Sequence, residues 1–88
     1  MNRQKEFVEY VIKLLVTRSD SVKVNVREGE KTNVIEIRAH IDDYGKIIGP
    51  SGRFINAIRV LLSVISREDK KRWVVEVPNK ESREKDSE

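Results

Sequence analysis

The sequence predicts a small α+β domain in which a three-stranded mixed sheet carries three helices on one face. Three observations lead to this prediction. Apolar residues recur with the period of a helix near the start of the chain, and the period changes to two over residues 22–41. A helical period then returns on both sides of a Gly-Pro-Ser-Gly interruption, and a last alternating segment precedes Pro78. A chain of 88 residues has room for one such domain with one small core.

The first expected helix spans residues 3–17. Its apolar residues are spaced by three and four, which gives the helix a broad apolar face, and Asn2 is a suitable residue to cap it. Residues 19–21 are Ser-Asp-Ser, and they end the pattern. The apolar residues of this helix are Phe7, Val8, Val11, Ile12, Leu14 and Leu15.

Two strands are expected next, joined as an antiparallel hairpin. Val22, Val24 and Val26 alternate with polar residues, which is typical of a half-buried strand. Residues 28–31 supply a short turn with a glycine. The second strand is expected to place its apolar residues on one face, and these are Ile35, Ile37, Ala39 and Ile41.

The second and third helices are expected to flank the Gly-Pro-Ser-Gly interruption. Asp42 is expected to cap a short helix that runs through Ile48. The third helix is expected over residues 53–67, because the proline and the glycines exclude one continuous helix. The main apolar stripe of the third helix is predicted to consist of Phe54, Ile58, Leu61 and Ile65, and this stripe is expected to be widened by Ile55, Ala57 and Leu62.

A last strand over residues 72–77 is expected to complete the sheet. The crossover through two helices favours a parallel pairing with the second strand. The predicted domain therefore covers residues 1–78. Residues 79–88 contain no apolar residue, so they are expected to form a disordered, charged tail. The inward residues of the last strand are predicted to be Trp73, Val75 and Val77, and Pro78 ends it.

The composition favours a binding protein over an enzyme. The chain has no cysteine and a single histidine, so it lacks the residues of most catalytic triads and zinc sites. That histidine, His40, is near Asp42 and Asp43, but its place on the polar side of the second strand favours a surface residue. No catalytic residue, metal or cofactor is expected. No apolar run is long enough to span a membrane and no secretory signal is recognised, so a cytoplasmic protein is expected.

Positive charge is concentrated in one part of the chain. The whole sequence has a net charge of +3, whereas residues 44–73 hold seven basic and two acidic residues. Such asymmetry fits a polyanionic partner, and a solvated basic surface has the same signature.

The segment from Gly49 to Gly52 is the most informative part of the sequence. Two glycines let the backbone bend tightly and let a ligand approach the main chain. The loop also leads into a helix N-terminus, where free N–H groups favour a phosphate, and Lys46 and Arg53 flank it with positive charge. The Gly-Lys-Ser/Thr ending of a P-loop is missing, so nucleotide hydrolysis is not expected. If the phosphates of a nucleic acid lie on this loop, its bases are expected to lie over an apolar groove lined by Ile47, Ile48 and Ile55.

The run Ile-Ile-Gly-Pro-Ser-Gly-Arg-Phe-Ile, placed between two helices, resembles the loop of KH domains. The additional helix and strand precede this core, which resembles the type II arrangement. The preceding Asp-Asp-Tyr-Gly-Lys and the following Ala-Ile-Arg are similar to the small bacterial stand-alone KH proteins of the KhpA type. The resemblance covers about residues 3–78. It implies a grip on about four nucleotides of single-stranded RNA, a role as an RNA chaperone or post-transcriptional regulator, and pairing as a homodimer or with a larger Jag-type KH protein.

Pro50 and Ser51 depart from the KH pattern, in which a lysine or arginine often stands between the glycines. Pro50 has no N–H to donate to a phosphate, whereas Ser51 keeps an N–H and a hydroxyl. Two functions therefore remain: a binder of single-stranded RNA, and a protein-interaction module whose nucleic-acid contact is weak. The choice between RNA and single-stranded DNA stays open, because contacts to a 2′-hydroxyl leave no trace in the sequence.

The candidate site extends beyond the loop. Phe54 and Trp73 lie on apolar faces, and core packing is favoured over base stacking for both. Lys70, Lys71 and Arg72 are additional candidates for contacts with the nucleic-acid backbone. The predicted RNA-binding residues are Lys46, Ile47, Ile48, Gly49, Pro50, Ser51, Gly52, Arg53, Ile55 and Arg59.

Overall fold

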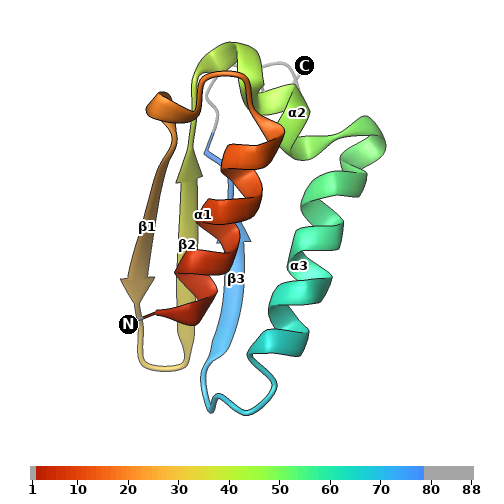
Figure 1. The fold of residues 1–88 in the computed structure, drawn as a ribbon. Helices are drawn as coiled ribbons and strands as arrows, with labels where there is room; N and C mark the ends of the chain where they lie inside the picture. The colour runs from red at the N-terminus through yellow and green to blue at the C-terminus, as the bar shows by residue number, and fades with distance from the viewer. Residues whose placement is uncertain (1, 79–88) are drawn as a thin grey trace, which may run out of the picture.

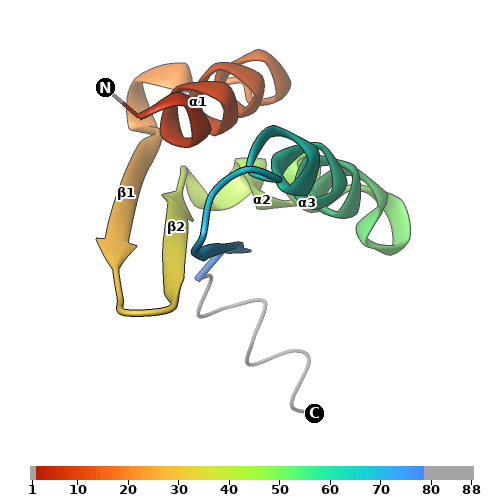
Figure 2. The ribbon, with the colours of Figure 1, turned by 90° about the horizontal axis from the view of Figure 1, so that it is seen from below.

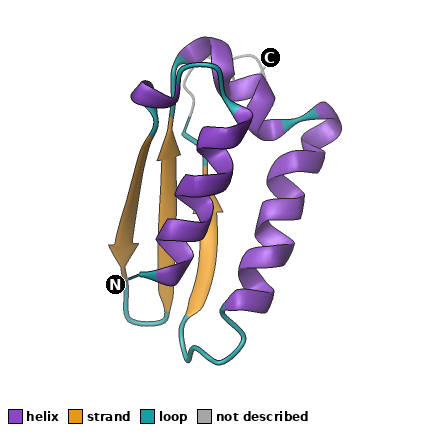
Figure 3. Ribbon diagram, in the orientation of Figure 1, coloured by secondary structure: helices purple, strands orange, loops and turns teal. Residues whose placement is uncertain are grey.

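The computed structural model describes residues 2–78, and the elements follow the predicted order within these residues (Figures 1 and 3). Met1 and residues 79–88 lie outside the described residues, and so does the predicted disorder of the tail. The helices are α1 (Arg3–Leu15), α2 (Tyr44–Ile48) and α3 (Arg53–Ile65), and the strands are β1 (Lys23–Glu28), β2 (Thr32–Arg38) and β3 (Arg72–Glu76).

The strands form one mixed sheet in the order β1-β2-β3. β1 pairs antiparallel with β2, with Val24 opposite Ile37, and β2 pairs parallel with β3, with Ile35 opposite Val75. All three helices cover the same face of this sheet, as the view from below in Figure 2 shows. The predicted fold class is therefore confirmed. The crossover from β2 through α2 and α3 makes β3 the edge strand on the side of α3.

The core lies between the sheet and the helices. Ile35 and Ile37 at the centre of β2 are fully buried, and so are Val8 and Ile12 of α1. Burial of a side chain of this kind stabilises the fold by about 1.5–3 kcal/mol. The core is completed by Val22, Val24, Ile47, Ile55, Ile58, Leu62 and Val75.

The first helix begins as predicted. The Asn2 side chain accepts a hydrogen bond from the N–H of Lys5 at 2.9 Å, which satisfies one of the free amides at the helix N-terminus. Val16 follows the helix in an extended conformation. The helix therefore ends two residues before the predicted end.

The segment before α2 differs from the prediction. Asp42 does not cap a helix, because Ile41–Asp43 form a 3-10 turn and α2 begins directly after it. His40 caps this turn, since its Nδ1 accepts the N–H of Asp42 at 3.1 Å. Ile41 does not continue the inward face of β2 and is 44% exposed. Both predictions are wrong because β2 ends at Arg38 and the chain then turns away from the sheet.

The third helix buries a different row of side chains from the predicted stripe. Ile58 faces the core as predicted, but Phe54 and Leu61 are 43% and 51% exposed. Ile55 and Leu62 take their place, and both are almost fully buried. The helix ends at Ile65 instead of residue 67.

Within residues 2–78, no single helix has the length and apolar character needed to cross a membrane. The helical stretches Ile41–Ile48 and Pro50–Ile65 reach that length and composition only when they are taken together, across a bend of 46°.

Candidate nucleic-acid interface

The loop between α2 and α3 is a 3-10 turn whose backbone requires glycine at two positions. Gly49 and Gly52 have φ angles of 79° and 75°, and Ser51 between them has a φ of 56°. The turn is closed by the N–H of Gly52, which donates to the carbonyl of Gly49 at 3.1 Å. Pro50 and Ser51 stand exposed at its tip. The loop therefore presents a tight, exposed corner directly before the N-terminus of α3.

The ring of Phe54 packs against the loop at Gly49. A Cβ atom added to Gly49 would lie 2.4 Å from Cγ of the Phe54 ring, which no real contact allows. Gly49 is therefore fixed as glycine both by its backbone angles and by this ring. The prediction that Phe54 packs in the core is wrong, because the ring lies under the loop and is 43% exposed.

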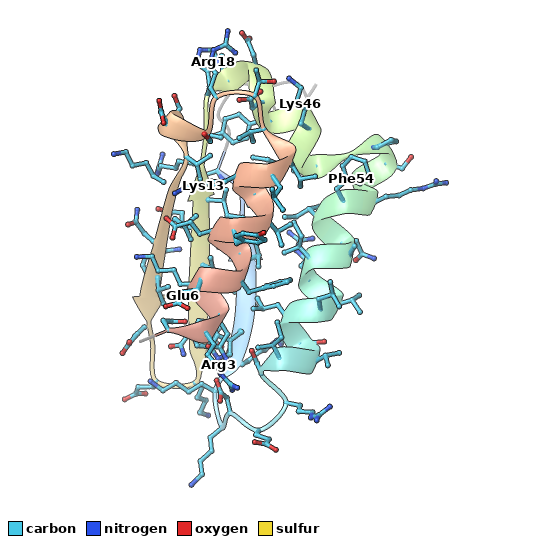
Figure 4. The ribbon with its side chains drawn as sticks, in the orientation of Figure 1. Arg3, Glu6, Lys13, Arg18, Lys46 and Phe54 are labelled. Carbon is cyan, nitrogen blue, oxygen red and sulfur yellow. The ribbon has the colours of Figure 1, made fainter. Side chains whose placement is uncertain are left out.

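Lys46 does not flank the loop with a free charge. Its Nζ donates to Thr17 Oγ1 at 2.6 Å and to Asp43 Oδ1 at 3.2 Å. Figure 4 shows Lys46 at the same end of the molecule as Arg18, whereas Phe54 lies at the start of α3. Arg53, the first residue of α3, is exposed and is the cation that adjoins the loop. The predicted positive flank of the loop is therefore provided by Arg53, and the amine of Lys46 is held elsewhere.

Asp43 anchors the connection between α1 and β1 to α2. Its side chain is fully buried, and its Oδ2 accepts the N–H of Arg18 at 3.0 Å. This hydrogen bond holds the pKa of the Asp43 carboxyl below its usual range, with help from the N–H of Thr17 and from Lys46, although burial acts in the opposite direction. The carboxylate is thus the form that the folded protein prefers.

We expect this carboxylate to make the fold sensitive to acid. Because the pKa of Asp43 is lower in the folded than in the unfolded chain, its stabilising contribution is complete above the unfolded pKa of about 4. The contribution is lost as the pH falls below that value towards the folded pKa. Urea unfolding from pH 7 to pH 2 measures this loss. Asp43→Asn should unfold more easily than the wild type at pH 7, and the difference should shrink at low pH. A constant difference over the whole range would contradict the role of Asp43.

The predicted apolar groove is not formed by the three isoleucines around the loop. Ile47 is fully buried and Ile55 is 5% exposed, so both belong to the core. Ile48 is half-buried and packs against the same core. The prediction that all three side chains line an open groove is wrong. The sequence shows that these positions are apolar, but it does not show which side of each short helix meets the sheet.

A groove does exist, between α3 and β3. Its main part has a volume of about 640 Å³, and a second hollow of about 360 Å³ shares Arg59, Val75 and Glu76 with it and continues to Pro78. The first part is lined by Arg59, Ser63, Ser66, Lys71, Arg72, Trp73, Val74, Val75 and Glu76.

The sequence analysis finds only some of the residues of this groove. Arg59, Lys71 and Arg72 are predicted candidates that line it, whereas Lys70 does not. The sequence analysis misses Ser63, Ser66, Val74, Val75 and Glu76, because their part in the groove depends on how α3 lies beside the edge of the sheet. Trp73 lies in the groove wall half-buried, and its Nε1 donates to Asp69 Oδ2 at 2.8 Å. The core position predicted for Trp73 is thus only partly correct.

The edge of β3 that faces away from β2 forms one wall of the groove, and within residues 2–78 no strand pairs with this edge. The N–H of Arg72 donates to the carbonyl of Lys31 at 2.9 Å, so the main-chain N–H and C=O of Arg72 point toward β2. Alternate residues of a strand direct their N–H and C=O groups to opposite edges. The main-chain groups of Trp73 and Val75 therefore point into the groove. Arg59 Nη2 donates to the carbonyl of Val75 at 3.2 Å.

Residues 2–78 contain no group of three His, Asp or Glu side chains that could hold a metal ion. His40 lies 3.7 Å from Asp42 Oδ2 and serves as a cap. It lies just after β2 and is half-buried, so it is not the exposed strand residue that the sequence predicts.

The fold and the loop define a KH domain of the type II class: a helix and a strand precede the core, and a Gly-x-x-Gly turn joins the two helices of the crossover. The chain belongs to the KhpA/KhpB KH domain family, whose model matches residues 5–77. The resemblance to KhpA-type KH proteins seen in the sequence is therefore confirmed.

Relatives of known name cover most of the chain. An RNA-binding protein KhpA of Borreliella burgdorferi is 43% identical over 72 residues, which are 82% of this chain and 88% of that protein. An RNA-binding protein KhpA of Aquifex aeolicus is 44% identical over 77 residues, or 88% and 98% of the two chains. One of Chlamydia pneumoniae is 48% identical over 64 residues, or 72% and 82%.

Proposed function

We propose that this protein binds single-stranded RNA, with phosphates at the Gly49–Gly52 loop and bases in the groove between α3 and β3. The observation that carries the proposal is the combination of an exposed glycine turn with a groove along the following helix, walled by an open strand edge. Relatives named as RNA-binding proteins support the same function. A module that holds about four nucleotides reads little sequence, which suits an RNA chaperone or post-transcriptional regulator in the cytoplasm.

The basic residues of the site favour a nucleic-acid backbone. Arg53 adjoins the loop, and Arg59, Lys71 and Arg72 line the groove along α3 and β3. Cations spread along one path can neutralise phosphates of a bound strand and release their counterions. Of the predicted site residues, Ile47 and Ile55 contribute only by packing in the core beneath the loop. Ile48 stays a candidate for direct contact with RNA.

We expect RNA affinity to fall with salt, with a slope of about −0.7 in log–log form for each phosphate contact of a single strand. Arg53→Ala should make the slope shallower by about one contact. Lys46→Ala should leave the slope as it is and lower the thermal stability, because its amine is bonded to Asp43 and Thr17. Fluorescence anisotropy with a short RNA between about 50 and about 200 mM salt measures both effects. An affinity that is indifferent to salt would contradict phosphate binding at this site.

A second proposal concerns assembly, as a homodimer or as a heterodimer with a larger Jag-type KH protein. The outer surface of α3 carries four apolar side chains that are 43–54% exposed, and α1 beside it adds Tyr10 and Leu14, which are 69% and 68% exposed. Figure 1 shows the two helices side by side on the covered face of the sheet. We name the four side chains of α3 the outer row, which consists of Phe54, Val60, Leu61 and Val64.

The outer row lies away from the RNA groove. At about 100° per residue, Leu61 points about 160° away from Arg59 around the helix axis. A partner bound to the outer row would therefore leave the groove open, and RNA binding and assembly would not compete. Ile47 and Ile55 beside the loop cannot offer such a contact, since both are buried.

We expect the pure protein to sediment as a dimer at tens of micromolar, and Leu61→Lys to convert it to a monomer by placing a charge in the contact. Ser19→Lys is the matched control, because it adds the same charge to an exposed turn outside the outer row. The control should stay dimeric. A wild type that remains monomeric at high micromolar concentration would leave only the heterodimer.

A further inference from the structure

Arg59 changes the hydrogen-bonding character of the groove at its centre. Val75 directs both its N–H and its C=O toward the open side of β3, so a bare edge would offer one donor and one acceptor side by side. Arg59 Nη2 already donates to this carbonyl at 3.2 Å. One lone pair of this acceptor is therefore engaged, and the guanidinium adds donors of its own.

The free groups of Arg59 itself are all donors. A guanidinium carries five N–H groups in a planar fork, and the hydrogen bond to Val75 uses one of them. Together with the N–H of Val75, the fork offers a ligand several donors and no acceptor of its own, although the lining also holds the hydroxyls of Ser63 and Ser66 and the carbonyl of Trp73. An adenine would bring the acceptor N7 beside an amino group, and that amino group would face the donors of Arg59. A guanine brings the two acceptors N7 and O6 side by side.

We propose that the Arg59 position of the groove selects guanine over adenine, because the guanidinium fork donates hydrogen bonds to the N7 and O6 atoms of guanine. This inference rests on the proposed RNA binding and names the base that the groove prefers. Arginine with guanine O6 and N7 is the most common base-specific contact of this geometry. A purine also covers more of the half-buried Trp73 in the groove wall than a pyrimidine does.

Arg59 is better placed for this task than the other basic residues of the site. Its fork is oriented by the Val75 carbonyl, so less side-chain freedom is lost when a base binds. Lys71 is a point charge without a fork, and Arg53 stands exposed at the loop. Glu76, the acidic residue of the lining, is paired with Arg27 at 3.0 Å and does not hold Arg59.

The test compares strands that differ in one base. Oligouridine strands with one central guanine, adenine, cytosine, inosine or 7-deazaguanine are titrated against the full chain by fluorescence anisotropy. Guanine should bind about tenfold more tightly than adenine, as a bidentate arginine contact predicts. Inosine keeps N7 and O6 and should match guanine. The 7-deazaguanine strand lacks N7 and should lose most of the advantage.

Variants of Arg59 separate base reading from charge. Arg59→Lys keeps the charge but loses the fork, so the preference for guanine should fall to within about twofold while the salt slope is retained. Arg59→Ala frees the Val75 carbonyl, so adenine should bind at least as well as guanine. Arg67→Ala is the control, because it removes one exposed arginine that lies outside the groove lining. The control should keep the wild-type preference.

Distinct results would overturn the inference. Equal binding of guanine and adenine by the wild type, equal binding of cytosine and guanine, or no effect of 7-deazaguanine would each exclude it while leaving RNA binding in place. An unchanged preference in Arg59→Lys would exclude it as well, and this variant decides if Arg59→Ala does not fold. If no strand binds the wild type, the proposed function fails and the base preference fails with it.

Discussion

A chain that carries Pro50→Asp and Ser51→Asp is expected to lose RNA binding and to keep its fold. Both residues are exposed at the tip of the glycine turn, and the φ of 56° at Ser51 is one that aspartate tolerates. Two carboxylates would stand where the proposed phosphates lie. A pair of like charges about 4 Å apart costs about 1 kcal/mol even in bulk water, so two such pairs should weaken binding by about 30-fold or more.

The matched control for this variant is Pro50→Asn with Ser51→Asn. Asparagine has nearly the shape of aspartate and also adopts a positive φ, but it carries no charge. The control should bind RNA within a few-fold of the wild type, and circular dichroism should be the same for all three proteins. If the aspartate variant is folded and binds RNA as tightly as the asparagine variant, the loop is not the phosphate site.

The order and pairing of the elements could be read from the sequence because each depends on a local signal. The alternation at Val22, Val24 and Val26 predicts a half-buried strand, and β1 does bury Val24 beside β2. A short turn makes the hairpin antiparallel, and a two-helix crossover makes the next pairing parallel. These rules need no knowledge of side-chain packing.

The face of α3 could not be read in the same way. The helix is apolar on more than one side, so spacing fits either Phe54 with Leu61 or Ile55 with Leu62 as the buried row. Only the second row meets the sheet. Two separate roles explain the excess of apolar residues. One side of the helix packs in the core. On the other side, Phe54 packs against the loop, and we propose that the rest of the outer row contacts a partner.

The candidate site shows the same limit. The glycine turn and Arg53 follow from a motif and were found. The groove was misplaced, because its walls come from α3 and from β3, and no sequence spacing reports that these two elements lie side by side. Lys46 was misjudged for a similar reason. Its partner Asp43 is only three residues away, but the burial of Asp43 and its contact with Arg18 depend on the fold.

The two glycines of the loop should respond very differently to alanine. Gly49 has φ 79° and ψ 171°, a region that is almost confined to glycine, and an added Cβ would meet the Phe54 ring at 2.4 Å. Gly52 has φ 75° and ψ 18°, in the left-handed region, and an added Cβ meets nothing within 4 Å. Gly49 is therefore required both by its backbone angles and by the space that the Phe54 ring occupies, whereas Gly52 is required only by its backbone angles.

We expect Gly49→Ala to lower the free energy of unfolding by about 3 kcal/mol and Gly52→Ala by about 1 kcal/mol. In a domain of this size, each kcal/mol lowers the melting temperature by about 4–8 °C. Thermal unfolding of the two variants and of the wild type measures the difference. Gly49→Ala should also weaken RNA binding, because the turn must rearrange to accept the new side chain.

A double-mutant cycle with Phe54→Ala assigns the excess cost of Gly49→Ala to its cause. If the ring is responsible, Gly49→Ala should be less costly when Phe54 is already alanine, by an amount that is well above the usual error of additivity of about 0.5 kcal/mol. The backbone part should remain in both backgrounds, since it does not depend on the ring. Equal costs of Gly49→Ala with and without Phe54 would show that the aromatic ring moves aside freely. The loop would then be held by its backbone alone, and Phe54 would be free to serve the outer row.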